Sequence, residues 1–160
     1  MIRHAKKEDA DSCIRLLSET KEDYPPQIKE SILKKLADEI ANREVFVSMD
    51  DDVLEGFVIF SRTNKELLML AIHPDYRNQG VATKLIYTVA GCFEPEDEIS
   101  VNFFGDEDQI RELKGFYYSC GFEDDDDEEK KGQRLIYRVK YDKGRWFDPL
   151  FILFGGTDRF

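Results

Sequence analysis

Residues 66–87 constrain the fold more than any other stretch of this chain. An apolar run at 67–72 is followed by Pro74 and then by a second apolar pattern. The positions of the second pattern have helical spacing: Val81, Leu85, Ile86 and Val89. A short apolar run that ends at a proline suits a buried strand, because proline cannot continue a central ladder. The stretch therefore predicts a strand, a tight turn and a helix that begins near Gly80.

The predicted start of this helix has the features of an anion site. The first N–H groups of a helix have no partner within it, and the helix dipole places partial positive charge there. Gly80 lets the main chain approach an anion closely, and Ala82 keeps the next turn small. Arg77 and Lys84 add positive charge. The segment predicts a pyrophosphate site, with an ordinary strand-to-helix turn as the alternative.

The rest of the chain alternates between apolar and turn-forming segments, as in an α/β domain. The other predicted strands are 1–5, 45–49, 54–60, 99–103, Phe122 and 135–139, and the other predicted helices begin near Glu8 or cover 27–41 and 107–119. The expected buried positions are Ile14, Leu16 and Leu17 in the first helix and Ile28, Ile32, Leu33, Leu36 and Ile40 in the second. The strand at 66–73 should close an antiparallel meander. A helical crossover should place the strand at 99–103 parallel to it.

Composition argues against several functional classes. The net charge of −11 disfavours nucleic acid or an anionic membrane as a partner, because phosphate contacts need clustered Lys and Arg. The three cysteines form no CxxC pair, so neither a disulfide framework nor a zinc site is indicated. The acidic run 123–129 is expected to be a solvated hairpin tip, and no metal is expected. With no signal peptide or long apolar run, the expected location is the cytoplasm.

Two motifs in this order resemble the GNAT superfamily of N-acetyltransferases. Arg77-x-x-Gly80-x-Ala82 is similar to the acyl-coenzyme A signature of that family. The segment 116–122 resembles its aromatic-Tyr-x-x-x-Gly-Phe element. The resemblance implies an acetyltransferase domain over residues 1–142. Its fold would be a mixed, mostly antiparallel sheet of about seven strands, with helices on both faces and strands 4 and 5 splayed apart.

The resemblance also implies a site for acetyl-CoA, which would be the acyl donor. The pantetheine arm would lie between the splayed strands and bond the main chain near Leu70 and Ile72, and an amide near Ile72 would stabilise the oxyanion. The pyrophosphate would lie on the loop and first helical turn: Arg77, Asn78, Gln79, Gly80, Val81, Ala82 and Thr83. Many members carry an asparagine where this chain has Ile110, so that contact with the cofactor is not expected here.

Two side chains are candidates for moving protons. Tyr117 occupies the position of the family tyrosine that protonates the departing thiolate, although it could be a core aromatic, and Tyr118 is an adjacent phenol. Glu66 lies six residues before Ile72, so both should point to one face of a regular strand. That spacing is similar to the general-base glutamate of the family's histone-type members. A water molecule is the alternative base.

The resemblance implies direct transfer of an acetyl group to a primary amine in a ternary complex. The acceptor would be a small-molecule or protein amine, and the acidic composition permits a cationic one. Two alternatives belong to other classes: a non-catalytic acyl-CoA binding or sensing module, and an interaction subunit of an oligomer.

The C-terminal extension 143–160 differs in character from the rest of the chain. Seven apolar residues crowd into 146–154: Trp146, Phe147, Leu150, Phe151, Ile152, Leu153 and Phe154. So apolar a segment should be covered. It should pack either on its own domain or on a partner subunit, and the second case would make the protein a homodimer.

Overall fold

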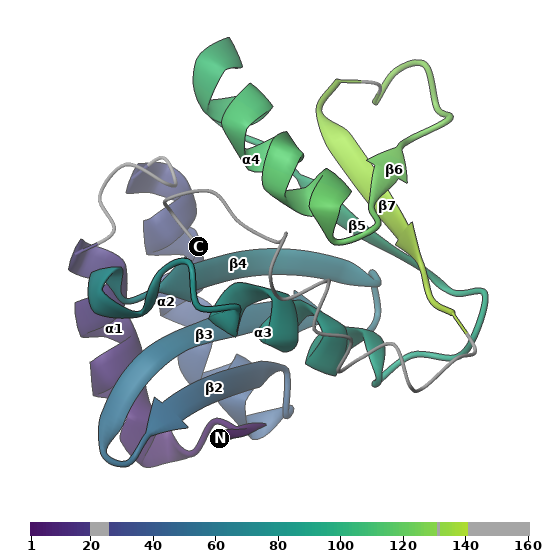
Figure 1. The fold of residues 1–160 in the computed structure, drawn as a ribbon. Coiled ribbons are helices and arrows are strands. Elements are labelled where there is room, and N and C mark those ends of the chain that lie inside the picture. Colours follow the sequence, from purple (N-terminus) through teal and green to yellow (C-terminus); the bar gives the residue numbers. More distant parts are fainter. Residues whose placement is uncertain (20–25, 131, 141–160) are drawn as a thin grey trace.

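The computed structural model describes residues 1–19, 26–130 and 132–140, apart from the side chains at positions 26–29 and 32. Within them a seven-stranded sheet has the order β1-β2-β3-β4-β5-β7-β6 (Figure 1). The strands are β1 (Ile2–His4), β2 (Val45–Asp50), β3 (Val53–Ser61), β4 (Glu66–Ile72), β5 (Glu98–Asn102), β6 (Glu123–Asp124) and β7 (Arg134–Arg138). The helices are α1 (Ala10–Glu19), α2 (Pro26–Ala41), α3 (Val81–Ala90) and α4 (Glu107–Ser119), with short 3-10 turns η1 (Lys7–Asp9) and η2 (Pro74–Tyr76).

The strand pairings confirm the predicted mixed sheet. β1 to β4 form an antiparallel meander, β5 and β6 each pair antiparallel with β7, and β4 pairs with β5 in parallel. The α3 crossover explains the parallel pair. A chain that leaves the end of one strand and returns through a helix enters the next strand in the same direction. The predicted α/β fold is therefore correct in strand number, direction and order of elements.

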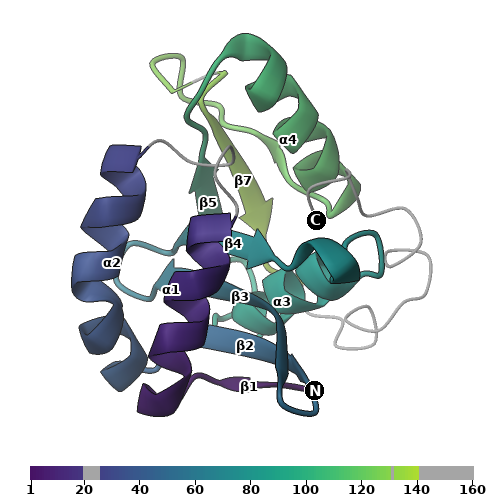
Figure 2. The same cartoon turned by 90° about the vertical axis from the view of Figure 1, so that its left-hand side faces the viewer.

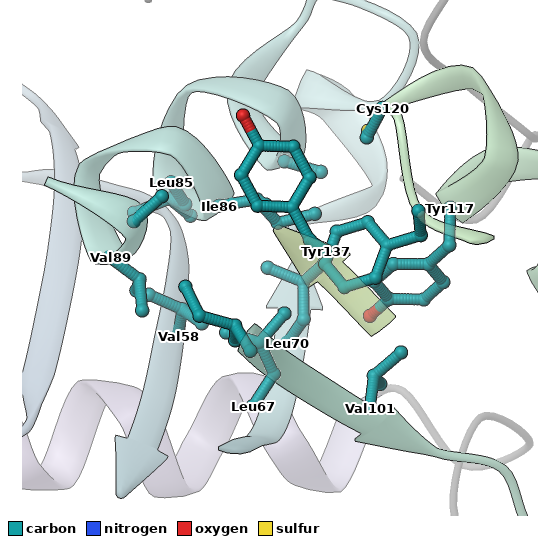
Figure 3. Close-up of a cluster of buried hydrophobic side chains, with 14 of the residues drawn as sticks. Val58, Leu67, Leu70, Leu85, Ile86, Val89, Val101, Tyr117, Cys120 and Tyr137 are labelled. Carbon is teal, nitrogen blue, oxygen red and sulfur yellow. The ribbon is translucent and has the colours of Figure 1, made fainter. Parts of the chain in front are cut away.

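The sheet separates two hydrophobic cores. On one face, α1 and α2 cover Val45, Val47, Phe57, Ile59, Met69 and Ala71. On the other face, α3 covers Phe46, Val58, Phe60, Leu67, Leu70 and Ile72, and α4 lies beside β5 and β7 (Figures 1 and 2). Because β3 and β4 are covered on both faces, most of their residues in sequence are apolar, without a polar residue at every second position. Figure 3 shows part of the second core, where side chains of α3 meet those of the strands and the end of α4.

The buried face of α1 differs from the prediction. Ile14 is 41% exposed, and Cys13 is buried in its place beside Leu16 and Leu17. A 3-10 turn at Lys7–Asp9 delays the start of α1 to Ala10. Cys13, Leu16 and Leu17 then form an i, i+3, i+4 stripe, and Ile14 lies about 100° away from Cys13 around the helix. The prediction for Ile14 is wrong.

The ends of two other elements also differ slightly from expectation. α2 begins at Pro26, one residue early, because proline fits the first turn of a helix. Leu36 and Ile40 are buried and Leu33 is partly buried, as predicted. The side chains of Ile28 and Ile32 are outside the described set. The strand expected at Phe122 is the two-residue β6, which starts one residue later. No described helix is long and apolar enough to cross a bilayer.

Candidate active site

The parallel strands β4 and β5 stay together for only two residue pairs, Glu66 with Ser100 and Leu67 with Val101. β4 continues to Ile72 and remains paired with β3 along this length. Beyond Leu67, therefore, one edge of β4 faces an opening wedge between the two strands. The predicted splay between strands 4 and 5 is present.

The backbone of β4 in this wedge is oriented by its pairing with β3. The N–H of His73 donates to the carbonyl of Glu55 at 2.8 Å, which makes this a hydrogen-bonded pair. Such pairs alternate with non-bonded pairs along an antiparallel ladder. The N–H and C=O groups of Leu70 and Ile72, which oppose Val58 and Gly56, therefore point away from β3 and toward the side of β5.

The turn after β4 has a geometry that only permissive residues adopt easily. Asn78 and Gly80 both have positive φ, at 63° and 81°. Asparagine and glycine are the residues that enter this left-handed region most readily. The turn is held by His73 Nδ1, which accepts from the N–H of Asp75 at 3.1 Å, and by Gln79 Nε2, which donates to the Asp75 carbonyl at 3.1 Å.

The helix α3 starts where the sequence predicts, directly after Gly80. Gly80 is the N-cap and supplies no side-chain cap. In the first helical hydrogen bond the N–H of Lys84 donates to the carbonyl of Gly80 at 3.1 Å. The N–H groups of the first turn, at Val81, Ala82 and Thr83, thus precede the first intrahelical donor. Ala82 and Thr83 have buried side chains, each 1% exposed, so these side chains do not point out from the start of the helix.

Arg77 does not extend freely from the turn. Its Nε lies 3.4 Å from the carbonyl oxygen of Ile72 and donates to it. The side chain thereby ties the turn to the end of β4 and holds a cation beside the helix N-terminus. Lys84, one turn into α3, is exposed. These two positive charges are adjacent to the backbone expected to hold a phosphate, in a chain whose net charge is −11.

Glu66 and Ile72 do not share a face of β4, contrary to the prediction. The register of β4 shifts between Ile59 and Phe60 of β3, which leaves Leu68 as an extra residue. A bulge of this kind breaks the regular alternation of side chains. Leu67 and Ile72 accordingly both belong to the α3–α4 core, and Glu66, next to Leu67, points to the α1–α2 face.

Asn102 is a site residue that sequence reasoning missed. Its Nδ2 donates to Glu66 Oε1 at 2.6 Å, so the two side chains bridge β4 and β5 where the wedge begins. Ser100 and Asn102 alternate with the buried Ile99 and Val101. That alternation is the available signal, because it places Asn102 on the face opposite the α3–α4 core.

The two adjacent tyrosines of α4 have different environments. Tyr117 is 3% exposed and packs edge to face against Phe103, Phe116 and Phe122, with ring centroids 5.2–5.5 Å apart. Phe103 directly follows β5, so Tyr117 lies on the α3–α4 side of the sheet near the wedge (Figure 3). Tyr118 is 45% exposed and its hydroxyl donates to Asp124 at 2.5 Å. This hydrogen bond raises the pKa of Tyr118 to about 12.

The three cysteines and the acidic run of the described chain are the remaining groups of interest. Burial raises the pKa of the Cys13 and Cys120 thiols to about 12, and it also raises the pKa of Cys92. Thiols with raised pKa values are poor nucleophiles at neutral pH. In the acidic run 123–129, Asp125 pairs with Arg134 at 3.5 Å. The described residues contain no group of three or more side chains arranged as metal ligands.

An open mixed sheet, with its one parallel pair splayed beside a helix N-terminus, places the protein among the α/β acetyltransferases. The chain belongs to the GNAT family: residues 41–124 match the model of the acetyltransferase (GNAT) domain. No curated protein sequence matches the chain.

Solved structures of similar fold agree with this assignment. A GNAT-family acetyltransferase from Bacillus cereus is 15% identical, with a TM-score of 0.64, over 89% of this chain and 98% of that one. Ard1 from Thermoplasma volcanium is 17% identical, with a TM-score of 0.64, over 89% and 98%. The PaiA N-acetyltransferase from Thermoplasma acidophilum, in complex with coenzyme A, is 22% identical, with a TM-score of 0.63, over 88% and 98%.

Proposed function

We propose that the protein transfers an acetyl group from acetyl-CoA to a primary amine by direct attack in a ternary complex. The observation that carries this proposal is the wedge itself. β4 leaves β5 after Leu67 and runs on to Ile72 with two sets of main-chain groups directed into the gap. It then leads through the turn at Gly80 into a helix N-terminus without a side-chain cap.

The donor would bind along this path. The pyrophosphate would lie on the main chain of residues 77–83, where the helix dipole and the cations Arg77 and Lys84 favour an anion. The pantetheine arm would then run into the wedge and pair with the backbone of Leu70 and Ile72, as an added strand pairs with a sheet edge. The binding of coenzyme A by the PaiA relative supports this choice of donor.

The reaction would join the amine nitrogen to the thioester carbonyl carbon and break the bond from carbon to sulfur. An amide near Ile72 would donate to the oxygen on which negative charge develops. Glu66, or a water molecule next to it, would accept the proton that the amine loses. Tyr117 would donate a proton to the departing coenzyme A thiolate.

Direct transfer is favoured over an acyl-enzyme intermediate by the state of the cysteines. A covalent route needs a thiolate of lowered pKa beside a base. Burial instead raises the pKa of all three thiols. The amine would therefore attack the donor itself.

The acceptor would approach from the α1–α2 face. Glu66 points to this face from the narrow end of the wedge, whereas the donor's phosphates would sit at its wide end. We propose a small-molecule or protein amine, of cationic character given the net charge of −11. Nucleic acid and membrane partners are not part of the proposal, and the proposed location is the cytoplasm.

The test is calorimetric titration with acetyl-CoA of the wild-type protein and of two variants at one position. Gly80→Asp and Gly80→Asn place side chains of equal size at φ 81°, a region that both residues tolerate. Only the aspartate adds a negative charge. At roughly 4 Å from a phosphate and an effective dielectric constant of about 20, that charge is worth about 4 kcal/mol, or about a thousandfold in Kd.

We expect one-site binding by the wild type, weaker binding by Gly80→Asn and loss of binding by Gly80→Asp. Absence of binding by folded wild-type protein would refute the donor. Equal Kd values for the two variants would refute the position of the pyrophosphate. Binding without turnover on any amine tested, together with no effect of Tyr117→Phe, would favour the acyl-CoA sensing module over the enzyme.

A further inference from the structure

A groove runs along α3 on the side of β1 and β2. It has a volume of about 1150 Å³. From α3 and its flanking turns it is lined by Gln79, Val81, Lys84, Thr88 and Gly91. Most of these are three or four residues apart, so they form one face of the helix. Its other walls include the apolar residues Met1, Ile2, Phe93, Pro95 and Val139. Met1, at the rim, is 78% exposed.

The chain itself leads out of this groove. Val139 and Lys140 line the groove, and Lys140 is the last described residue. The next twenty residues, 141–160, contain the apolar cluster between 146 and 154. A segment tethered at the rim has an effective concentration in the millimolar range. It therefore has an advantage over the same segment of a second molecule at ordinary protein concentrations.

Charge favours residues 141–160, rather than a charged partner, as the occupant of the groove. Residues 141–160 contain three basic and three acidic residues and are neutral, so the net charge of −11 belongs to residues 1–140. Two cations, Lys84 and Lys140, and two carboxylates, Glu55 and Glu94, line the groove. A neutral segment adds no net charge to it.

The length of the segment is sufficient. From Val81 to Gly91 the groove extends along ten helical steps, about 15 Å at 1.5 Å per residue. An extended chain covers that distance in about five residues. Residues from 146 onward can therefore reach any part of the groove from Lys140.

We propose that residues 141–154 cover this groove in the same molecule, with the apolar side chains of 146–154 packed against α3 and the β1–β2 edge. The occupant is thus the protein's own C-terminal extension. The groove shares Gln79, Val81 and Lys84 with the proposed pyrophosphate site, so the covering segment would border the donor.

Trp146 provides a direct test, because it is the sole tryptophan of the chain. Its fluorescence reports the environment of the segment in the full-length protein. We expect a blue-shifted emission and weak quenching by acrylamide, compared with a synthetic peptide of residues 141–160. Thr88→Glu places a charge in the groove at a partly exposed position and should shift both readings toward those of the peptide. Thr88→Gln, of the same size but neutral, should shift them less.

Ser31→Glu is the matched control. It adds the same charge at an exposed hydroxyl residue of α2, which covers the opposite face of the sheet, and should leave Trp146 unchanged. Circular dichroism and Tm verify that each variant is folded. Peptide-like emission of the wild type, or equal emission of folded Thr88→Glu and Ser31→Glu, would overturn the proposal. Protection of Trp146 that disappears on dilution, as a dimer becomes a monomer in sedimentation velocity, would place the segment on a second copy and overturn it as well.

Discussion

Gly56 of β3 lies opposite Ile72 of β4, at the point where the wedge meets the turn. A Cβ at position 56 would lie 2.8 Å from the carbonyl oxygen of Ala71 and 2.6 Å from Ile72 Cδ1. The side-chain atom can rotate away, but the carbonyl belongs to the backbone of β4. We therefore predict that Gly56→Ala displaces β4 by about 0.5 Å and destabilises the fold by about 1–3 kcal/mol, as overpacking does.

For a chain of this length, such a loss lowers Tm by roughly 3–10 °C. Because the displaced backbone includes Ile72, we also expect the Kd for acetyl-CoA to rise by about tenfold.

Gly115→Ala is the control. This glycine lies inside α4, and beyond the backbone of its own helix no described atom lies within 4 Å of the place that a Cβ would take. The same substitution should there stabilise the protein by about 0.5–1 kcal/mol. Differential scanning fluorimetry and calorimetric titration give both readings. Equal Tm shifts for the two variants, or an unchanged Kd for Gly56→Ala, would refute the reasoning.

Three further predictions concern ionisable groups. Glu66→Gln should lower kcat and leave the Kd for acetyl-CoA unchanged, and an unaffected kcat in a steady-state assay would assign the base to water. Tyr117→Phe should lower kcat by about 10²-fold or more, and an unaltered rate would leave Tyr117 as a core aromatic only. Burial, with a contribution from Glu44, raises the pKa of Glu39 to about 7 from its ordinary value of 4.5. The neutral form is thus favoured in the folded state, so stability is fully present below pH 4.5 and declines by at most about 3 kcal/mol as pH rises through 7. Glu39→Gln should remove this decline from a plot of Tm against pH, and an unchanged slope would exclude Glu39 as its source.

Much of the fold is predictable because its signals are local. The apolar run before Pro74, the helical spacing after Gly80 and the polar joins between strands each depend on a few neighbouring residues. The predicted bounds of α4 agree with the observed ones, since Asp106 and Gln109 form a capping box at its start. The prediction for Ile14 is wrong because either Cys13 or Ile14 could share the buried face of this short helix with Leu16 and Leu17. Packing against the sheet, rather than local sequence, chooses between them.

The candidate site is less predictable because it depends on pairing between strands. The bulge at Leu68 follows from the register of β3 against β4, and it turns Glu66 to the opposite face from Ile72. The hydrogen bond from Asn102 to Glu66 joins residues 36 positions apart. The proposed domain boundary at 142 and the role of 143–160 concern residues outside the described part of the chain, and they stay predictions.

The sequence by itself determined which segments are strands and helices, the order in which they occur and the turn that ends at Gly80. These properties follow from periodicity, proline and glycine, which act over a few residues. Only the tertiary structure decided where β5 leaves β4, which face each side chain of β4 takes and which residues border the groove beside α3. Those properties depend on the register and packing of segments distant in the chain, and a shift of one residue in a strand reverses every face.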